Sequence, residues 1–165
     1  MKKLQYLVIH CTATPEGRAV TSKQIREWHT SPPPKGRGWS QVGYSDMIHL
    51  NGMVENLVPY NDDEYVDPRE LTNGAVGINS ISRHVVYVGG MDEDMKWSRD
   101  TRTREQLLAL RNYVVHQIAI HPEIKVGGHN QFAAKACPSF DVPKWLRSIG
   151  IAEKNICNHA LMIKL

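Results

Sequence analysis

A histidine, a lysine and a cysteine lie close together in a segment that favours a loop. Residues 127–141 read GGHNQFAAKACPSFD, which brings His129, Lys135 and Cys137 into one short stretch with no helical or strand periodicity. Imidazole and thiolate groups are both good zinc ligands, and a catalytic zinc site uses three protein ligands and one open position. His129 and Cys137 are therefore candidate ligands, and the third ligand must come from elsewhere in the chain.

The best candidate for the third ligand is His10. It ends the apolar segment LQYLVIH (residues 4–10) and is followed by the polar residues CTAT. Functional sites of α/β sheets gather where the strands end. The next residue, Cys11, is expected to point to the opposite face of the strand as a small buried side chain.

These residue types do not decide the chemistry by themselves. Eight histidines and three cysteines allow many groups of three. A hydrogen-bonded His129 and a core thiol at Cys137 are equally consistent with the pattern. Two other histidines give weaker signals. His29 lies near the end of an exposed helix and is expected to have an ordinary surface or packing role, whereas His84 begins an apolar strand and is expected to be partly buried.

The candidate residues need a scaffold, and strands alternate with helices along the chain. Apolar segments rich in β-branched residues predict three strands, at residues 4–10, 84–90 and 124–129. Asn51-Gly52 predicts a hairpin between GYSDMIHL and VENLVPY. Apolar periodicity and capping patterns predict three helices, at residues 22–30, about 104–120 and 142–149.

This order of elements predicts a single α/β domain with a central mixed β-sheet flanked by helices. Residues 1–150 are expected to form this domain, and residues 151–165 a C-terminal tail of unknown role. The apolar stripe of the longest helix is expected to face the core. This stripe comprises Leu107, Leu110, Val114 and Ile118, and is widened by Leu108 and Val115.

The length of 165 residues suits one domain with a sizeable core. Its 20 basic and 17 acidic residues are too evenly balanced to indicate a nucleic-acid partner. We find no apolar segment long enough to span a membrane and expect no stable membrane association. The apolar run at residues 4–9 is too short for a signal peptide. We therefore expect a monomer that is cytoplasmic as synthesised, with thiols that are reduced or bind a metal.

Four motifs occur in order along the chain: VIHCTAT, VGYSDMIHLNG, GINSIS with VVYVGG, and GGHNQFAAKACPSFD. Together they resemble the type-2 family of zinc-dependent N-acetylmuramoyl-L-alanine amidases over about residues 4–147. This family shares its fold with phage lysozymes of amidase activity and with peptidoglycan recognition proteins. The resemblance implies one zinc ion per chain, held in a groove at one edge of the sheet. It also implies hydrolysis of the amide bond between N-acetylmuramic acid and L-alanine in peptidoglycan.

The family's functional residues can be carried onto this sequence one by one. The zinc ligands fall on His10, His129 and Cys137, the same three residues that the chemistry of the side chains suggested. Two catalytic residues fall on Tyr44, beside the metal, and on Lys135, which would lie on the same side as Cys137 if the segment is extended. A core aromatic at Tyr44 and a solvated loop lysine at Lys135 are the structural alternatives.

The sequence departs from the family pattern at three positions that are not zinc ligands. Ser45 stands where many relatives have a histidine or an apolar residue, and Gly74 stands where many have a histidine. His84 stands where relatives usually have a small residue. Residues 32–42 and 61–82 are expected to form the walls of the substrate groove, because both segments are polar and rich in glycine or proline.

The resemblance favours a lytic amidase of phage or prophage type, which acts on the cell wall after release from the cell. A host enzyme that recycles wall fragments would have the same sequence features. A non-catalytic module that binds peptidoglycan or muropeptides is the alternative function. A protein with a structural zinc is less consistent with the sequence, because structural sites usually have four protein ligands.

Overall fold

A computed structural model describes residues 1–162 of the chain. Its centre is a five-stranded sheet in the order β5-β4-β7-β2-β9. Four of these strands run parallel, and β5 runs antiparallel to β4. The strands are β2 (Tyr6–Cys11), β4 (Asp46–Ile48), β5 (Val54–Asn56), β7 (Ser82–Tyr87) and β9 (Lys125–Gly128). The expected mixed sheet is confirmed, and the hairpin at Asn51-Gly52 supplies its antiparallel edge.

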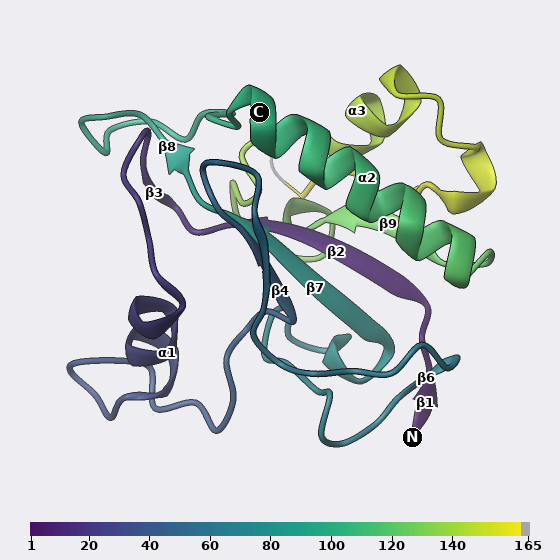
Figure 1. The fold of residues 1–165 in the computed structure, drawn as a ribbon, viewed down its shortest axis with the longest axis horizontal. Coiled ribbons are helices and arrows are strands. Elements are labelled where there is room, and N and C mark those ends of the chain that lie inside the picture. Colours follow the sequence, from purple (N-terminus) through teal and green to yellow (C-terminus); the bar gives the residue numbers. More distant parts are fainter. Residues whose placement is uncertain (163–165) are drawn as a thin grey trace.

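In the described part of the chain, three helices flank the sheet (Figure 1). They are α1 (Ser22–Thr30), α2 (Arg104–Ile120) and α3 (Val142–Ser148). Short elements surround this framework: the strand pairs β1 (Lys2–Lys3) with β6 (Tyr65–Val66) and β3 (Thr14–Pro15) with β8 (Gly90–Met91), and 3-10 turns at Asn79–Ile81, His129–Gln131 and Glu153–Asn155.

The sheet is buried on both faces, and alternate residues of each strand pack into different clusters. Leu7, Ile9 and Cys11 of β2 belong to the cluster under α2 and α3. Val86 of β7 points to the other face, where Ile25 of α1 also packs. Because side chains alternate along a strand, His10 lies on the α1 face and Cys11 on the α2 face. The buried position expected for Cys11 is confirmed.

The bounds of α1 and α2 agree with the sequence prediction because both helices begin at a reciprocal capping box. Thr21 accepts a hydrogen bond from the backbone N–H of Gln24, whose side chain accepts one from the N–H of Thr21. Thr103 and Gln106 make the same pair of bonds at the start of α2. These bonds pair N–H groups that have no partner inside the helix.

The expected core face of α2 is partly wrong. Leu107, Leu108 and Val115 are exposed, by 38%, 59% and 49%. The buried face instead comprises Gln106, Leu110, Tyr113, Val114 and Gln117. Its polar members are buried because each finds a hydrogen-bond partner in the sheet: Gln106 donates to the carbonyls of Ile48 and Val88, Tyr113 donates to Asp46, and Gln117 accepts from Arg83.

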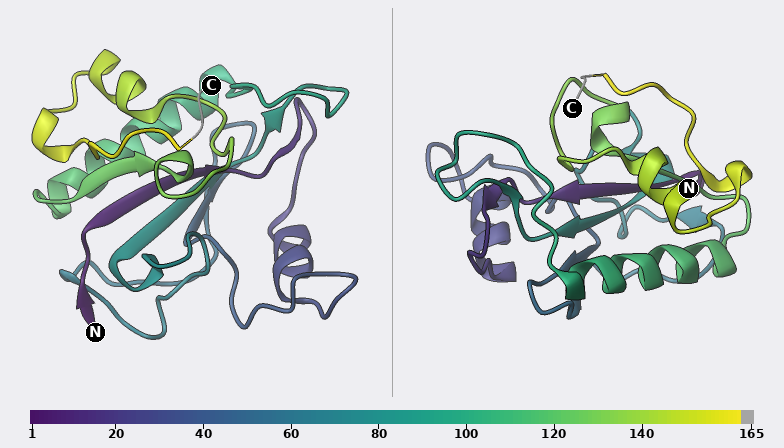
Figure 2. Two further views of the ribbon diagram at one scale, coloured as in Figure 1. Left: turned by 180° about the vertical axis from the view of Figure 1, so that it is seen from behind. Right: turned by 90° about the horizontal axis from the view of Figure 1, so that it is seen from above.

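The segment after α3 packs against the free edge of β9 (Figure 2). Ile156 forms a parallel bridge with Val126 and is fully buried in the main core cluster. Gln131 donates from its side chain to the carbonyls of Cys157 and His159. This segment therefore covers the edge strand β9, which leads directly into the loop that begins at His129. Among residues 1–162, none of the helices has the length and apolar composition needed to cross a bilayer.

Candidate active site

Three side chains that are far apart in the sequence converge at the carboxyl end of β2. His10 is near the end of this strand, and Ile9 is paired with Gly128 of β9, which leads directly into His129. The ligand atoms of His10, His129 and Cys137 all lie within 4.8 Å of one another. The rings of the two histidines are 4.7 Å apart, and Nδ1 of His10 is 3.7 Å from Sγ of Cys137.

The three donors suit a tetrahedral zinc ion. With Zn–N bonds of about 2.0 Å and a Zn–S bond of about 2.3 Å, an imidazole nitrogen and a thiolate sulfur on one zinc are about 3.5 Å apart. The separation of 3.7 Å between Nδ1 of His10 and Sγ of Cys137 is close to this value. Sγ of Cys137 also accepts a hydrogen bond of 3.3 Å from the backbone N–H of Cys11, a contact that would stabilise a thiolate.

Burial sets the protonation of these groups. It lowers the pKa of His10 well below the ordinary value, and the nearby His84 lowers it further. Burial, followed by the charge of Lys135, lowers the pKa of His129 to about 4. Both imidazoles are therefore neutral at neutral pH, as metal ligands must be. Burial raises the pKa of Cys137, so its thiol would lose a proton only on binding a cation.

Tyr44 and Lys135 both line the pocket in which the three candidate ligands lie. The Tyr44 ring is 5.2 Å from the His10 ring. It also packs on the cluster that contains Ile25 and Val86, on the α1 face of the sheet. Burial raises the pKa of Tyr44, so its hydroxyl is protonated and can donate. Lys135 is exposed and lies in a series of turns rather than in an extended strand, because its N–H donates to the carbonyl of Ala133. The turns nevertheless keep Lys135 and Cys137 on the same pocket.

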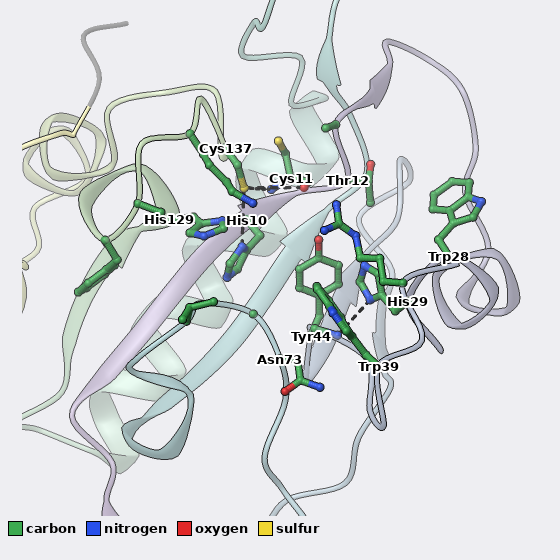
Figure 3. A pocket seen from close by; sticks show the side chains of 18 residues that line it. His10, Cys11, Thr12, Trp28, His29, Trp39, Tyr44, Asn73, His129 and Cys137 are labelled. Carbon is green, nitrogen blue, oxygen red and sulfur yellow. Dashed lines mark hydrogen bonds between the residues drawn. The ribbon is translucent and has the colours of Figure 1, made fainter. Parts of the chain in front are cut away.

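The pocket has a volume of about 430 Å³ and extends from the candidate ligands to α1 (Figure 3). The two segments expected to form its walls both contribute. Arg37 and Trp39 come from residues 32–42, with the guanidinium 5.1 Å from the centre of the indole ring. Asn73, Gly74 and Val76 come from residues 61–82. Cationic, aromatic and amide groups thus line one cleft beside the three donors.

Sequence reasoning missed two histidines of this region. His29 is 8% exposed and lines the pocket, where its Nδ1 accepts a hydrogen bond of 3.0 Å from the N–H of Gly43. Ile25, Trp28 and His29 lie three and four residues apart on one helical face, and this spacing could have indicated that His29 is buried. His84 is fully buried rather than partly buried, and it contacts His10 directly.

Comparisons with known proteins agree with the motifs. The family model described as N-acetylmuramoyl-L-alanine amidase matches residues 1–140. The endolysin of Escherichia phage T7 is 33% identical over 139 residues, which cover 84% of this chain and 83% of the relative. The endolysin of Klebsiella phage KP32 is 34% identical over 140 residues, with the same coverage of both chains.

Two solved structures share the fold at low identity. The Ph2119 endolysin from a Thermus scotoductus bacteriophage superposes with a TM-score of 0.66 at 23% identity, over 95% of this chain and 88% of that chain. Drosophila PGRP-LB superposes with a TM-score of 0.65 at 20% identity, over 95% of this chain and 89% of that chain. These two likenesses support the arrangement of sheet and helices described above.

Proposed function

Because the chain belongs to the N-acetylmuramoyl-L-alanine amidase family, we propose that it is a phage-type lytic enzyme that uses one zinc ion. The substrate would be peptidoglycan or its muropeptides, cut between N-acetylmuramic acid and L-alanine. The observation that carries the zinc proposal is the convergence of His10, His129 and Cys137 at one end of a pocket. The phage endolysins among its relatives support a lytic role on the cell wall after release, and we expect the enzyme to act as a monomer.

His10, His129 and Cys137 would hold the metal. A zinc ion bound there would supply Lewis acidity toward the amide carbonyl and acidify a water to a pKa of about 7. The chain contributes two neutral imidazoles and a thiol that ionises on binding. Three protein ligands are the number typical of catalytic zinc sites, whereas structural sites usually have four.

Lys135 and Tyr44 would act on the reacting groups. The ammonium group of Lys135 borders the pocket and would stabilise the negative charge that develops on the carbonyl oxygen. The protonated hydroxyl of Tyr44 would hydrogen-bond the attacking water or the tetrahedral intermediate. Arg37 and Trp39 would bind the stem carboxylates and a sugar face, because they present a cation and an aromatic plate in the same cleft.

Two measurements test this proposal. Protein purified without added metal should contain about one zinc per chain by elemental analysis, and Cys137→Ala should lose most of it while Cys157→Ala keeps it. Incubation with muropeptides should release intact stem peptides with a free L-alanine amine, detected by mass, and a chelator should stop the release. Full zinc content in Cys137→Ala would refute the ligand set. Tight muropeptide binding with zinc present and no released peptide would instead identify a recognition module.

A further inference from the structure

A histidine that is not one of the proposed ligands contacts the proposed ligand His10. His84 of β7 is fully buried, and its Nδ1 is 2.9 Å from Nε2 of His10. The parallel pairing of β2 with β7 places His84 opposite Val8, so His84 and His10 are diagonal neighbours on the same face of the sheet. The register of the two central strands thus brings the two rings together.

The two nitrogens of His10 face different partners. Nδ1 points toward Cys137 and the proposed metal position, and Nε2 points toward His84. A neutral imidazole that offers the lone pair of Nδ1 to a metal carries its proton on Nε2. That proton needs an acceptor, and Nδ1 of His84 is at hydrogen-bond distance. We propose that His84 is a positioning residue that fixes the ring of His10 and its tautomer for zinc binding, an inference that rests on the proposed zinc site.

The neighbouring glycine shows that the site is built around this imidazole. A Cβ atom at Gly74 would lie 2.4 Å from Nδ1 and 2.5 Å from Cγ of His84. Any side chain at position 74 would therefore displace the ring from His10. Gly74 and His84 are two of the positions at which the sequence departs from the amidase pattern, and the structure joins them in a single packing contact.

The chemistry of His84 argues against a role in packing alone. Its Nε2 is buried and has no hydrogen-bond partner among the described residues. Burying an unpaired polar nitrogen is unfavourable, so an apolar side chain of similar size would stabilise this position at least as well. The imidazole differs from such a side chain in offering His10 an acceptor. Partners of this kind orient metal ligands, and removing them weakens metal affinity about 10- to 100-fold.

Two substitutions separate positioning from packing. His84→Leu removes the acceptor and fills its place with an apolar side chain. In His84→Asn, the Oδ1 atom can take the place of Nδ1 as the acceptor for His10. We expect zinc affinity, measured on the full chain by competition with a chromophoric chelator, to fall about 10- to 100-fold in His84→Leu and by much less in His84→Asn. The visible spectrum of the cobalt-substituted protein should change in His84→Leu and resemble the parent spectrum in His84→Asn.

Stability of the zinc-free protein supplies the control. Urea unfolding should show His84→Leu to be as stable as the parent or more stable, so that its loss of zinc affinity cannot be a folding defect. His121→Leu, which removes another buried imidazole outside the pocket, should keep the parent affinity for zinc. Parent-like affinity in His84→Leu, or equal losses in the Leu and Asn variants, would overturn the positioning role. An unmodified chain that binds no zinc would overturn the proposed metal site itself.

Discussion

His29 offers a prediction in which the magnitude follows from the structure. Its ring packs between Trp39 and Tyr44, with centroids 4.9 and 5.2 Å away, and it accepts a hydrogen bond from Gly43. Burial, and then the charge of Arg37, lowers its pKa from about 6.5 to about 4. The native state therefore keeps His29 neutral over a pH range in which the unfolded chain becomes protonated.

The sign of the effect follows from this difference. As the pH falls below about 6.5, the unfolded state binds a proton at His29 and the native state does not, so the free energy of unfolding decreases. The loss continues until the pH reaches the native pKa of about 4. Between about pH 7 and pH 5.5, one such histidine lowers the free energy of unfolding by about 1.2 kcal/mol.

The substitution His29→Asn isolates this contribution. Oδ1 of asparagine can accept the N–H of Gly43 in place of Nδ1, and the amide does not titrate in this range. We expect urea unfolding to show that the variant loses about 1.2 kcal/mol less stability than the parent between about pH 7 and pH 5.5.

His116→Asn is the matched control, because His116 is exposed on α2. It should follow the pH dependence of the parent. The reasoning is refuted if His29→Asn loses as much stability on acidification as the parent does, since His29 would then titrate alike in the folded and unfolded chains.

Two further substitutions test the catalytic and structural assignments. Lys135→Ala should keep its zinc and its fold but lower the turnover of muropeptides about 10²- to 10³-fold. Lys144→Ala, on the surface of α3, is the control and should keep the turnover of the parent. Equal turnover in both variants would make Lys135 an ordinary loop residue. Tyr113→Phe should lower the free energy of unfolding by about 1.5 to 3 kcal/mol, because Asp46 loses a buried hydrogen bond. Urea unfolding measures this loss. Tyr65→Phe, which changes an exposed tyrosine, is the control. An unchanged unfolding midpoint for Tyr113→Phe would contradict the prediction.

The sequence alone determined the local elements and the choice of candidate metal donors. Capping boxes and apolar periodicity depend on residues three or four positions apart, so the bounds of α1 and α2 could be predicted from short segments. The three candidate ligands could be selected because imidazole and thiolate chemistry narrows the choice, and because the motifs around His10, His129 and Cys137 occur in the order typical of one family.

Only the tertiary structure decided which polar groups are buried and what they contact. Periodicity assigned Leu107, Leu108 and Val115 to the core, but the partners offered by the sheet bury Gln106 and Tyr113 instead. The contact between His10 and His84 depends on the register of β2 against β7, two strands that are far apart in the sequence. Both strands are buried on both faces, so neither carries the alternation of polar and apolar residues that would specify this register from the sequence.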